Sequence, residues 1–259
     1  EMHGYDTYDY GARGMYPAIM RFTTPDPLAE KYYSISPYAY CGNNPVMRID
    51  PNGKDIWEIN NQGKIINRIK DKTQDTFYMV AKDDDGNYQR TFTIDKEGNK
   101  TYNSISFEYG TVESQRTLTF SPDGKDVKSY DIYKVRGDEN STKLFEFMAT
   151  NTSVEWSQAK TGIEGKNGLN FITTSHYTTK EYGMSYLYIG QLYAGYSIRE
   201  LIHSHPHDTP YPSGLSDGNG DIGFSRLVIN NRQANRLNIP TFSIFLPLSN
   251  SYLNYGRKE

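Results

Sequence analysis

The sequence predicts an α+β fold in which a β-rich first half precedes a region that mixes strands with helices. Short alternating runs separated by Gly- and Asn-containing turns fill residues 54–147, which is the pattern of an antiparallel sheet. After residue 148, apolar strands stand beside a helical pattern at 221–235. The chain also holds 23 tyrosines, an abundance that indicates a sheet with half-buried aromatic surface. We therefore divide the chain into residues 1–53, 54–147 and 148–259.

The composition argues against several classes of protein. The 28 basic residues nearly balance the 31 acidic ones, the net charge is −3, and the basic residues are dispersed, so we expect no nucleic-acid partner. No run approaches about 18 apolar residues, which argues against a membrane span, and the polar start Glu1–Gly4 leads us to expect no signal peptide. A lone Cys41 predicts a fold without an internal disulfide.

Residues 1–53 alternate aromatic and turn residues and hold too little apolar surface for an independent core. This region resembles the end of the RHS repeat-associated core, and Asp50-Pro51-Asn52-Gly53 is similar to the Asp-Pro-x-Gly motif that closes it. The resemblance implies an RHS shell that encapsulates a polymorphic toxin, with the toxin following as C-terminal cargo. Met20 and Lys54 depart from the family pattern, so self-cleavage at the motif and a simple surface turn both stay open.

Residues 54–147 are predicted to form an antiparallel β-meander. Turn signals at 61–64, 85–87, 97–100 and 123–125 each supply a residue that tolerates a positive φ. The predicted strands between them are 64–69, 88–94, 101–109 and 127–135. No catalytic constellation stands in these runs, so we expect this region to pack against the C-terminal domain.

The chemistry of the chain is concentrated around His203 and His205. Their spacing places both imidazoles on one face of a strand 196–205, and Pro206 should end that strand. Asp221 is the preferred third ligand because it stands at the predicted N-cap of the helix 221–235, whereas its rival Asp217 lies among glycines. Two imidazoles and one carboxylate suit Zn²⁺ and leave a fourth position open, as catalytic sites do.

The same cluster resembles the JAMM (JAB/MPN) metalloproteases, including their JAB-like toxin members, whose signature is His-x-His-Pro followed by Ser and Asp. The resemblance implies that His203, His205 and Asp221 bind zinc and that Ser213 steadies the tetrahedral intermediate. Members of the family usually have two residues between the Ser and the Asp, and here seven intervene. The pair Ser216 and Asp217 therefore stays open as an alternative.

The resemblance also implies an upstream glutamate that acts as general base toward a water molecule. We prefer Glu155 because it lies between apolar and aromatic neighbours, where burial would raise its pKa toward the working pH. Glu200 should lie on the opposite face of its strand from the two histidines. The remaining candidates are Glu146, Glu164 and Glu181.

These patterns together predict a zinc-dependent JAMM-like peptidase or isopeptidase that forms the toxin module of an RHS-type polymorphic toxin. The resemblances imply a protein or peptide substrate, a cognate immunity protein, and delivery to a target cell as a secreted effector. The alternative is a non-catalytic β-rich module that binds a partner protein and uses zinc structurally or not at all. A closed four-ligand metal site would favour that alternative.

Overall fold

The computed structural model describes residues 8–9, 14–16, 21–23, 54–71, 74–121, 125–216 and 218–256. The chain divides into two compact units, Glu1–Gly53 and Lys54–Glu259. In the first unit three short strands form an antiparallel sheet: β1 (Tyr8–Asp9), β2 (Gly14–Tyr16) and β3 (Arg21–Phe22). The Asp50-Pro51-Asn52-Gly53 motif lies outside the described residues.

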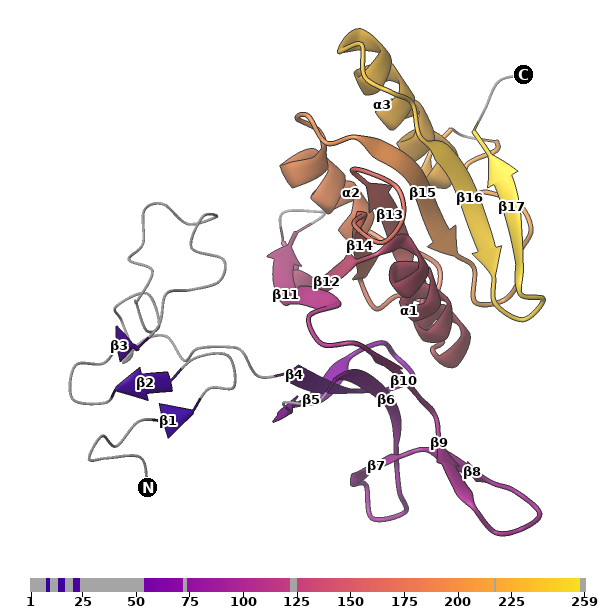
Figure 1. Cartoon of the computed structure of the whole chain (residues 1–259). Helices are drawn as coiled ribbons and strands as arrows, with labels where there is room; N and C mark the ends of the chain where they lie inside the picture. The colour runs from indigo at the N-terminus through magenta and orange to yellow at the C-terminus, as the bar shows by residue number, and fades with distance from the viewer. Residues whose placement is uncertain are drawn as a thin grey trace. The chain divides into compact units, whose positions relative to one another are not determined.

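The second unit begins with seven strands in two small sheets (Figure 1). The strands are β4 (Lys54–Ile59), β5 (Ile65–Asp71), β6 (Asp75–Lys82), β7 (Tyr88–Arg90), β8 (Phe92–Ile94), β9 (Lys100–Tyr102) and β10 (Ser104–Phe107). The first sheet has the order β10-β6-β4-β5 with β7 paired to β6, and β8 and β9 form the second.

The predicted meander is wrong in two respects. Strand β6 passes to the far side of β4 and pairs with it in parallel, so the sheet is mixed. The predicted strands 88–94 and 101–109 are each divided in two, at Thr91 and Asn103. The reason is a change of partner: the Thr91 N–H donates to the Met79 carbonyl and the Asn103 N–H donates to the Thr91 carbonyl, so the ladder passes from β6 to β9 there.

A seven-stranded sheet forms the centre of the second unit, in the order β11-β12-β14-β13-β15-β16-β17. All neighbouring strands are antiparallel except β15 and β16. The strands are β11 (Val112–Phe120), β12 (Lys128–Arg136), β13 (Ser157–Thr161), β14 (Leu169–Thr174), β15 (Ile198–Ser204), β16 (Thr241–Leu246) and β17 (Ser251–Tyr255).

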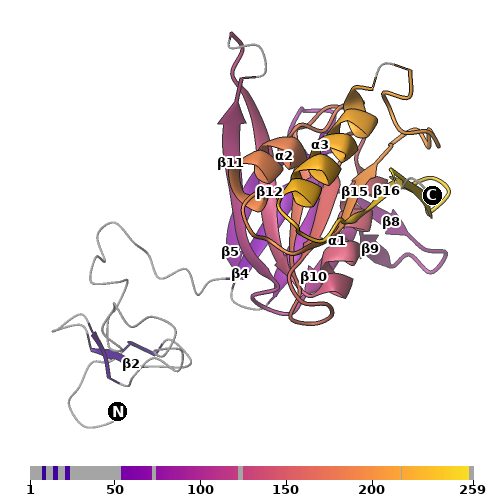
Figure 2. The ribbon, with the colours of Figure 1, turned by 90° about the horizontal axis from the view of Figure 1, so that it is seen from above.

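Helices cover both faces of the large sheet. The helical segments are α1 (Asp138–Asn151), α2 (Gly183–Leu187), the π-helical η3 (Tyr188–Leu192) and α3 (Gly220–Ala234). Helix α1 packs on one face together with the small sheet, whereas α2, η3 and α3 pack on the other. Figure 2 shows α2 and α3 next to one another along the sheet. The fold is therefore mixed α+β, as the sequence predicts.

The predicted domain boundary between residues 147 and 148 falls inside α1. The large sheet begins before this boundary, at Val112 of β11. Strand β11 pairs with β12, and β12 pairs with β14 from Asp131 to Arg136. Strands on both sides of the predicted boundary therefore belong to one sheet. Local patterns could not show this because the ladder joins segments that are distant in the sequence.

The alternation of β15 decides which side chains reach which helix layer. Ile202 belongs to the core beneath α1, and Leu201 belongs to the core beneath α2 and α3. Since side chains on a strand alternate between faces, His203 lies on the same face as Leu201. Within the described residues, no helix is both long and apolar enough to cross a membrane.

Candidate metal centre and catalytic cleft

The two histidines lie at the C-terminal end of β15. His203 pairs with Ser157 of β13 on one side and with Ile244 of β16 on the other. His205 directly follows the strand, and its backbone N–H still donates to the Phe245 carbonyl at 3.0 Å. The strand ends before Pro206, as the sequence predicts, because proline has no N–H with which to extend the ladder.

Three ligand-type atoms converge beside the end of this strand. The Nε2 atoms of His203 and His205 are 3.0 Å apart, and Oδ2 of Asp221 lies 3.2 Å and 3.6 Å from them, respectively. Ligand atoms bound to a tetrahedral zinc ion at about 2.0–2.1 Å are themselves about 3.3 Å apart. In the described residues these side chains are the one group of three or more His, Cys, Asp or Glu that is close enough to share an ion. Their chemistry and their spacing both fit Zn²⁺.

The other ring nitrogen of each histidine already has a partner. Nδ1 of His205 lies 2.7 Å from the Thr209 carbonyl, which can only accept, so this nitrogen carries the proton. Nδ1 of His203 lies 3.3 Å from the Tyr255 hydroxyl. Outer hydrogen bonds of this kind hold the rings in place. With Nδ1 protonated, Nε2 of His205 keeps a lone pair that can bind an ion, and Nε2 of His203 lies 3.0 Å from it.

Asp221 reaches the histidines from the first turn of α3. The sequence predicts Asp221 at the N-cap, but this is wrong: Asn219 is the N-cap residue and the helix begins at Gly220. Burial would raise the pKa of Asp221, but hydrogen bonds with His203 and His205 outweigh it and hold that pKa well below its usual range. The carboxylate is therefore charged at neutral pH and suited to a cation.

Ser213 lies against Asp221 in spite of the long intervening loop. The Ser213 N–H donates to Asp221 Oδ2 at 2.6 Å, and the Asp221 N–H donates to the Ser213 hydroxyl oxygen at 3.0 Å. Ser213 also lines the cleft, whereas Ser216 is exposed and does not. Asp217, the rival ligand, lies outside the described residues.

Glu155 lies in the same cleft as the three ligand candidates. It precedes β13, where its N–H donates to the Tyr177 carbonyl and its carbonyl accepts from the Thr174 hydroxyl. Burial raises the pKa of its carboxyl to about 8; the nearby His205 opposes this effect and Asp221 adds to it. A carboxyl in this position can exchange a proton near neutral pH.

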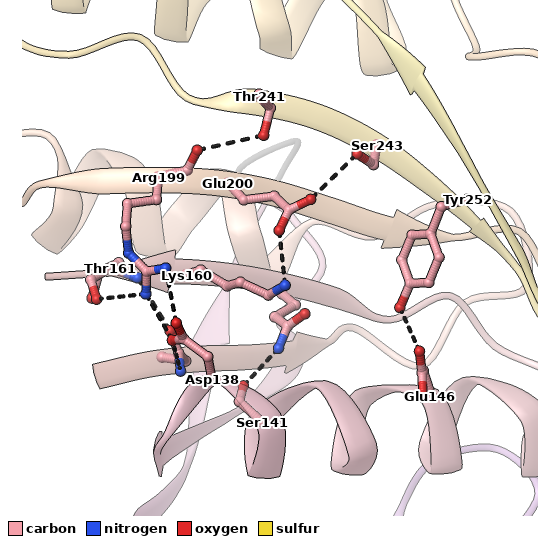
Figure 3. Close-up of polar contacts among 12 residues, drawn as sticks. Asp138, Ser141, Glu146, Lys160, Thr161, Arg199, Glu200, Thr241, Ser243 and Tyr252 are labelled. Atoms are coloured by element: carbon pink, nitrogen blue, oxygen red, sulfur yellow. Dashed lines mark hydrogen bonds and ion pairs between the residues drawn. The ribbon is translucent and has the colours of Figure 1, made fainter. Parts of the chain in front are cut away.

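The other glutamate candidates have different surroundings. Figure 3 shows Glu200 and Glu146 on the α1 side of the sheet, where Glu200 pairs with Lys160 at 2.8 Å and Glu146 accepts from the Tyr252 hydroxyl at 2.9 Å. The opposite-face position expected for Glu200 is confirmed. Glu164 is exposed after β13.

Glu181 does line the cleft, but its carboxylate is engaged with the protein. It accepts from the backbone N–H groups of Gly183 at 2.6 Å and Met184 at 2.8 Å, at the start of α2. It also accepts from the Thr173 hydroxyl at 3.0 Å. Glu181 therefore anchors the helix. Of the two glutamates in the cleft, Glu155 is the one available to act as a general base.

The cleft has a volume of about 760 Å³ and two chemically different parts. One part holds Glu155, the two histidines, Ser213 and Asp221. The other is bounded by apolar side chains of α2, η3, β15 and α3: Met184, Ile189, Leu201, Phe224 and Leu227. A substrate bound along the cleft would therefore contact a reactive end and an apolar wall.

Tyr255 and Thr209 are site residues that sequence reasoning missed. Tyr255 comes from β17, and its hydroxyl meets His203 only because β15, β16 and β17 are neighbours in the sheet. Thr209 contributes a backbone carbonyl, which carries no residue-type signal. The three-residue gap between His205 and Thr209, closed by the turn at Pro206, is the one local hint of that contact.

Residues 133–226 match a family model described as JAB-like toxin 1. The matched segment runs from β12 into α3 and includes Glu155, His203, His205, Ser213 and Asp221. Comparisons with curated proteins and with solved structures give no match. The similarity supports a JAB-like toxin domain in this part of the chain.

Proposed function

We propose that the second unit is a zinc-dependent hydrolase that cleaves an amide bond, in a peptide or an isopeptide, as the active domain of a toxin. The observation that carries this proposal is the convergence of His203 Nε2, His205 Nε2 and Asp221 Oδ2 in a cleft that also holds Glu155. Three protein ligands with an open side are typical of catalytic zinc sites. The match to JAB-like toxin 1 supports the toxin role.

When bound, zinc would polarise the substrate carbonyl and lower the pKa of a water molecule to about 7. Glu155 would accept the proton of that water and pass it to the leaving amine, because its pKa of about 8 lies close to the working pH. Asp221 and the histidines would hold the ion, with Tyr255 and the Thr209 carbonyl fixing the rings.

Ser213 would stabilise the oxyanion that develops as water attacks the amide. Its hydroxyl oxygen accepts the Asp221 N–H, which leaves the hydroxyl hydrogen to be directed toward the cleft. Donors placed in this way are worth roughly 10²–10³ in kcat. The same contact gives Ser213 a second role in holding Asp221.

The cellular setting is proposed from resemblance. Residues 1–53 would be the end of an RHS shell of the same polypeptide, and the second unit would be its cargo, delivered to a target cell. A toxin of this kind needs a cognate immunity protein in the producing cell, and we propose such a protein as its partner. Cleavage at Asp50-Pro51-Asn52-Gly53 would release the cargo.

A protein-binding module with structural zinc is the other candidate. That role calls for a closed site of four protein ligands. In the described part of the chain the group has three members, and it opens on a cleft of about 760 Å³. His207 is exposed and outside the group. These observations favour the hydrolase.

A matched pair of histidine variants tests the proposal. The whole chain is expressed inside bacteria as wild type, His203→Ala or His207→Ala, and growth and bound zinc are measured. We expect the wild type and His207→Ala to hold one zinc ion and to stop growth, and His203→Ala to lose both properties. Equal toxicity of His203→Ala and the wild type would overturn metal-dependent catalysis as the cause.

A further inference from the structure

The apolar wall of the cleft is an exposed hydrophobic surface next to the reactive groups. We use this name for Met184, Ile189, Leu201, Phe224 and Leu227. Met184 and Leu201 are buried at its base, whereas Ile189 is 62% exposed and Leu227 is 46% exposed. Covering large exposed apolar side chains in a cleft removes their surface from water, which stabilises a complex with an apolar ligand.

The wall includes an unusual backbone segment. The Tyr193 N–H donates to the Tyr188 carbonyl at 2.7 Å, so η3 closes with the five-residue hydrogen bond of a π-helix. Single π-helical turns are rare and often mark functional sites, because the additional residue shifts the side chains that follow. Ile189 lies in this turn and lines the cleft.

The two sides of the wall are held together beneath the surface. The Tyr188 hydroxyl donates to Asn231 Oδ1 of α3 at 2.7 Å, and the Tyr188 ring meets the Phe224 ring edge-on at 5.9 Å. Both contacts join η3 to α3. The apolar wall is therefore preorganised, which lowers the entropic cost of binding.

The apolar wall restricts which side chains it can accept. The one lysine that lines the cleft, Lys180, is exposed and is not part of the wall. An acidic or polar side chain that packs on the wall would be desolvated there without a partner. An uncharged apolar group avoids this cost.

We propose that the cleft selects peptides by a large aliphatic or aromatic side chain next to the cleaved amide, which packs on the apolar wall against Ile189 and Leu227. This specificity rests on the proposed amide hydrolysis, because the position of the cleaved amide beside Glu155 and the histidines determines which substrate side chain reaches the apolar wall. The substrate class is an extended peptide segment with leucine or phenylalanine beside the scissile bond. One methylene in such a pocket changes discrimination by about 10- to 200-fold.

The test measures binding without turnover. Zinc-loaded Glu155→Gln protein is titrated into two fluorescein-labelled peptides, Gly-Ser-Gly-Xaa-Gly-Ser-Gly, in which Xaa is Leu or Ser, and Kd is read from fluorescence anisotropy. We expect the Leu peptide to bind at least about tenfold more tightly than the Ser peptide. Ile189→Ser and Leu227→Ser, added to Glu155→Gln, should abolish the difference between Leu and Ser.

Ile163→Ser is the matched control, because Ile163 is 66% exposed and does not line the cleft. This variant should keep the Leu preference. The inference is overturned if the Leu and Ser peptides bind equally, if neither binds at millimolar protein, or if both wall variants keep the preference. Cleavage of the same peptides by the wild type is scored separately. If the Leu peptide binds preferentially but is not cleaved, the proposed hydrolysis is contradicted and the apolar specificity stands. If the peptides are cleaved without a preference for Leu, the specificity is contradicted and the hydrolysis stands.

Discussion

The Ser213 N–H donates to Asp221 Oδ2 at 2.6 Å, and the Asp221 N–H donates back to the Ser213 hydroxyl oxygen at 3.0 Å. A third bond runs from the Ile222 N–H to the Ser213 carbonyl at 3.2 Å. The loop between these residues is therefore closed at its base, and the Asp221 carboxylate is oriented by backbone groups toward His203 and His205.

Asp221→Ala should abolish zinc binding, because it removes the one carboxylate beside both Nε2 atoms in the described part of the chain. Asp217→Ala is the control on the same loop and should retain zinc. Metal content after dialysis, measured by atomic emission, compares the two variants. If Asp217→Ala loses zinc and Asp221→Ala retains it, Asp217 is the ligand and Asp221 is not.

Gly214→Ala should disturb the loop that positions Asp221. Gly214 has φ +83°, and a Cβ there would clash with the backbone of Asn219. Gly86 has the same φ of +83° with nothing within 4 Å, so Gly86→Ala isolates the cost of the backbone conformation. We expect zinc affinity to fall by at least tenfold in Gly214→Ala and to be unchanged in Gly86→Ala, as measured by competition with a chromogenic chelator. An equal change of zinc affinity in the two variants would show that the close contact between Gly214 and Asn219 does not position Asp221.

Glu155→Gln should keep zinc and lose turnover. The amide preserves the shape of the side chain but cannot accept a proton, and a general base contributes about 10²- to 10⁴-fold. The measurement is kcat on a peptide that the wild type cleaves, together with zinc content. Full activity of Glu155→Gln would remove Glu155 from the mechanism.

The same substitution should change how the stability of the metal-free protein depends on pH. The folded-state pKa of Glu155, about 8, lies above its ordinary value of 4.5, because burial favours the neutral form. The folded protein therefore keeps this proton where the unfolded chain releases it. The resulting stabilisation is complete below pH 4.5 and is lost as the pH rises through about 8.

A pKa that differs by one between the folded and the unfolded state corresponds to about 1.4 kcal/mol. Between pH 5 and pH 9, the chelated wild type should lose a few kcal/mol more unfolding free energy than Glu155→Gln. Urea titrations across this range provide the comparison. Identical pH profiles would contradict the raised pKa.

Tyr255→Phe should weaken zinc binding by about 10- to 100-fold, because the hydroxyl that meets His203 Nδ1 at 3.3 Å is removed. Tyr252→Phe is the matched control on β17, since the Tyr252 hydroxyl donates to Glu146 rather than to a histidine. Calorimetric titration with zinc gives both affinities. An unchanged affinity in Tyr255→Phe would show that His203 is held without this contact.

Features that depend on local backbone geometry can be predicted from the sequence. The strand period places His203 on the face of Leu201 and sends Glu200 to the other, and Pro206 ends the strand because it has no N–H. The spacing of apolar residues predicts a helix at 221–235, which is observed at Gly220–Ala234. The apolar and aromatic residues of 239–246 indicate a strand, which is observed at Thr241–Leu246. Each of these signals spans a few neighbouring residues.

Which distant groups join the histidines depends on the tertiary structure. Strand order brings Tyr255 to His203 across 52 positions, and the close approach at Gly214 brings Ser213 to Asp221 across a glycine-rich loop. Glu155 and Glu181 both enter the cleft, and only the backbone N–H groups of α2 show that Glu181 is already engaged. Such contacts depend on sheet order and backbone packing, to which residues far apart in the sequence contribute. They therefore cannot be predicted from any short stretch of the sequence.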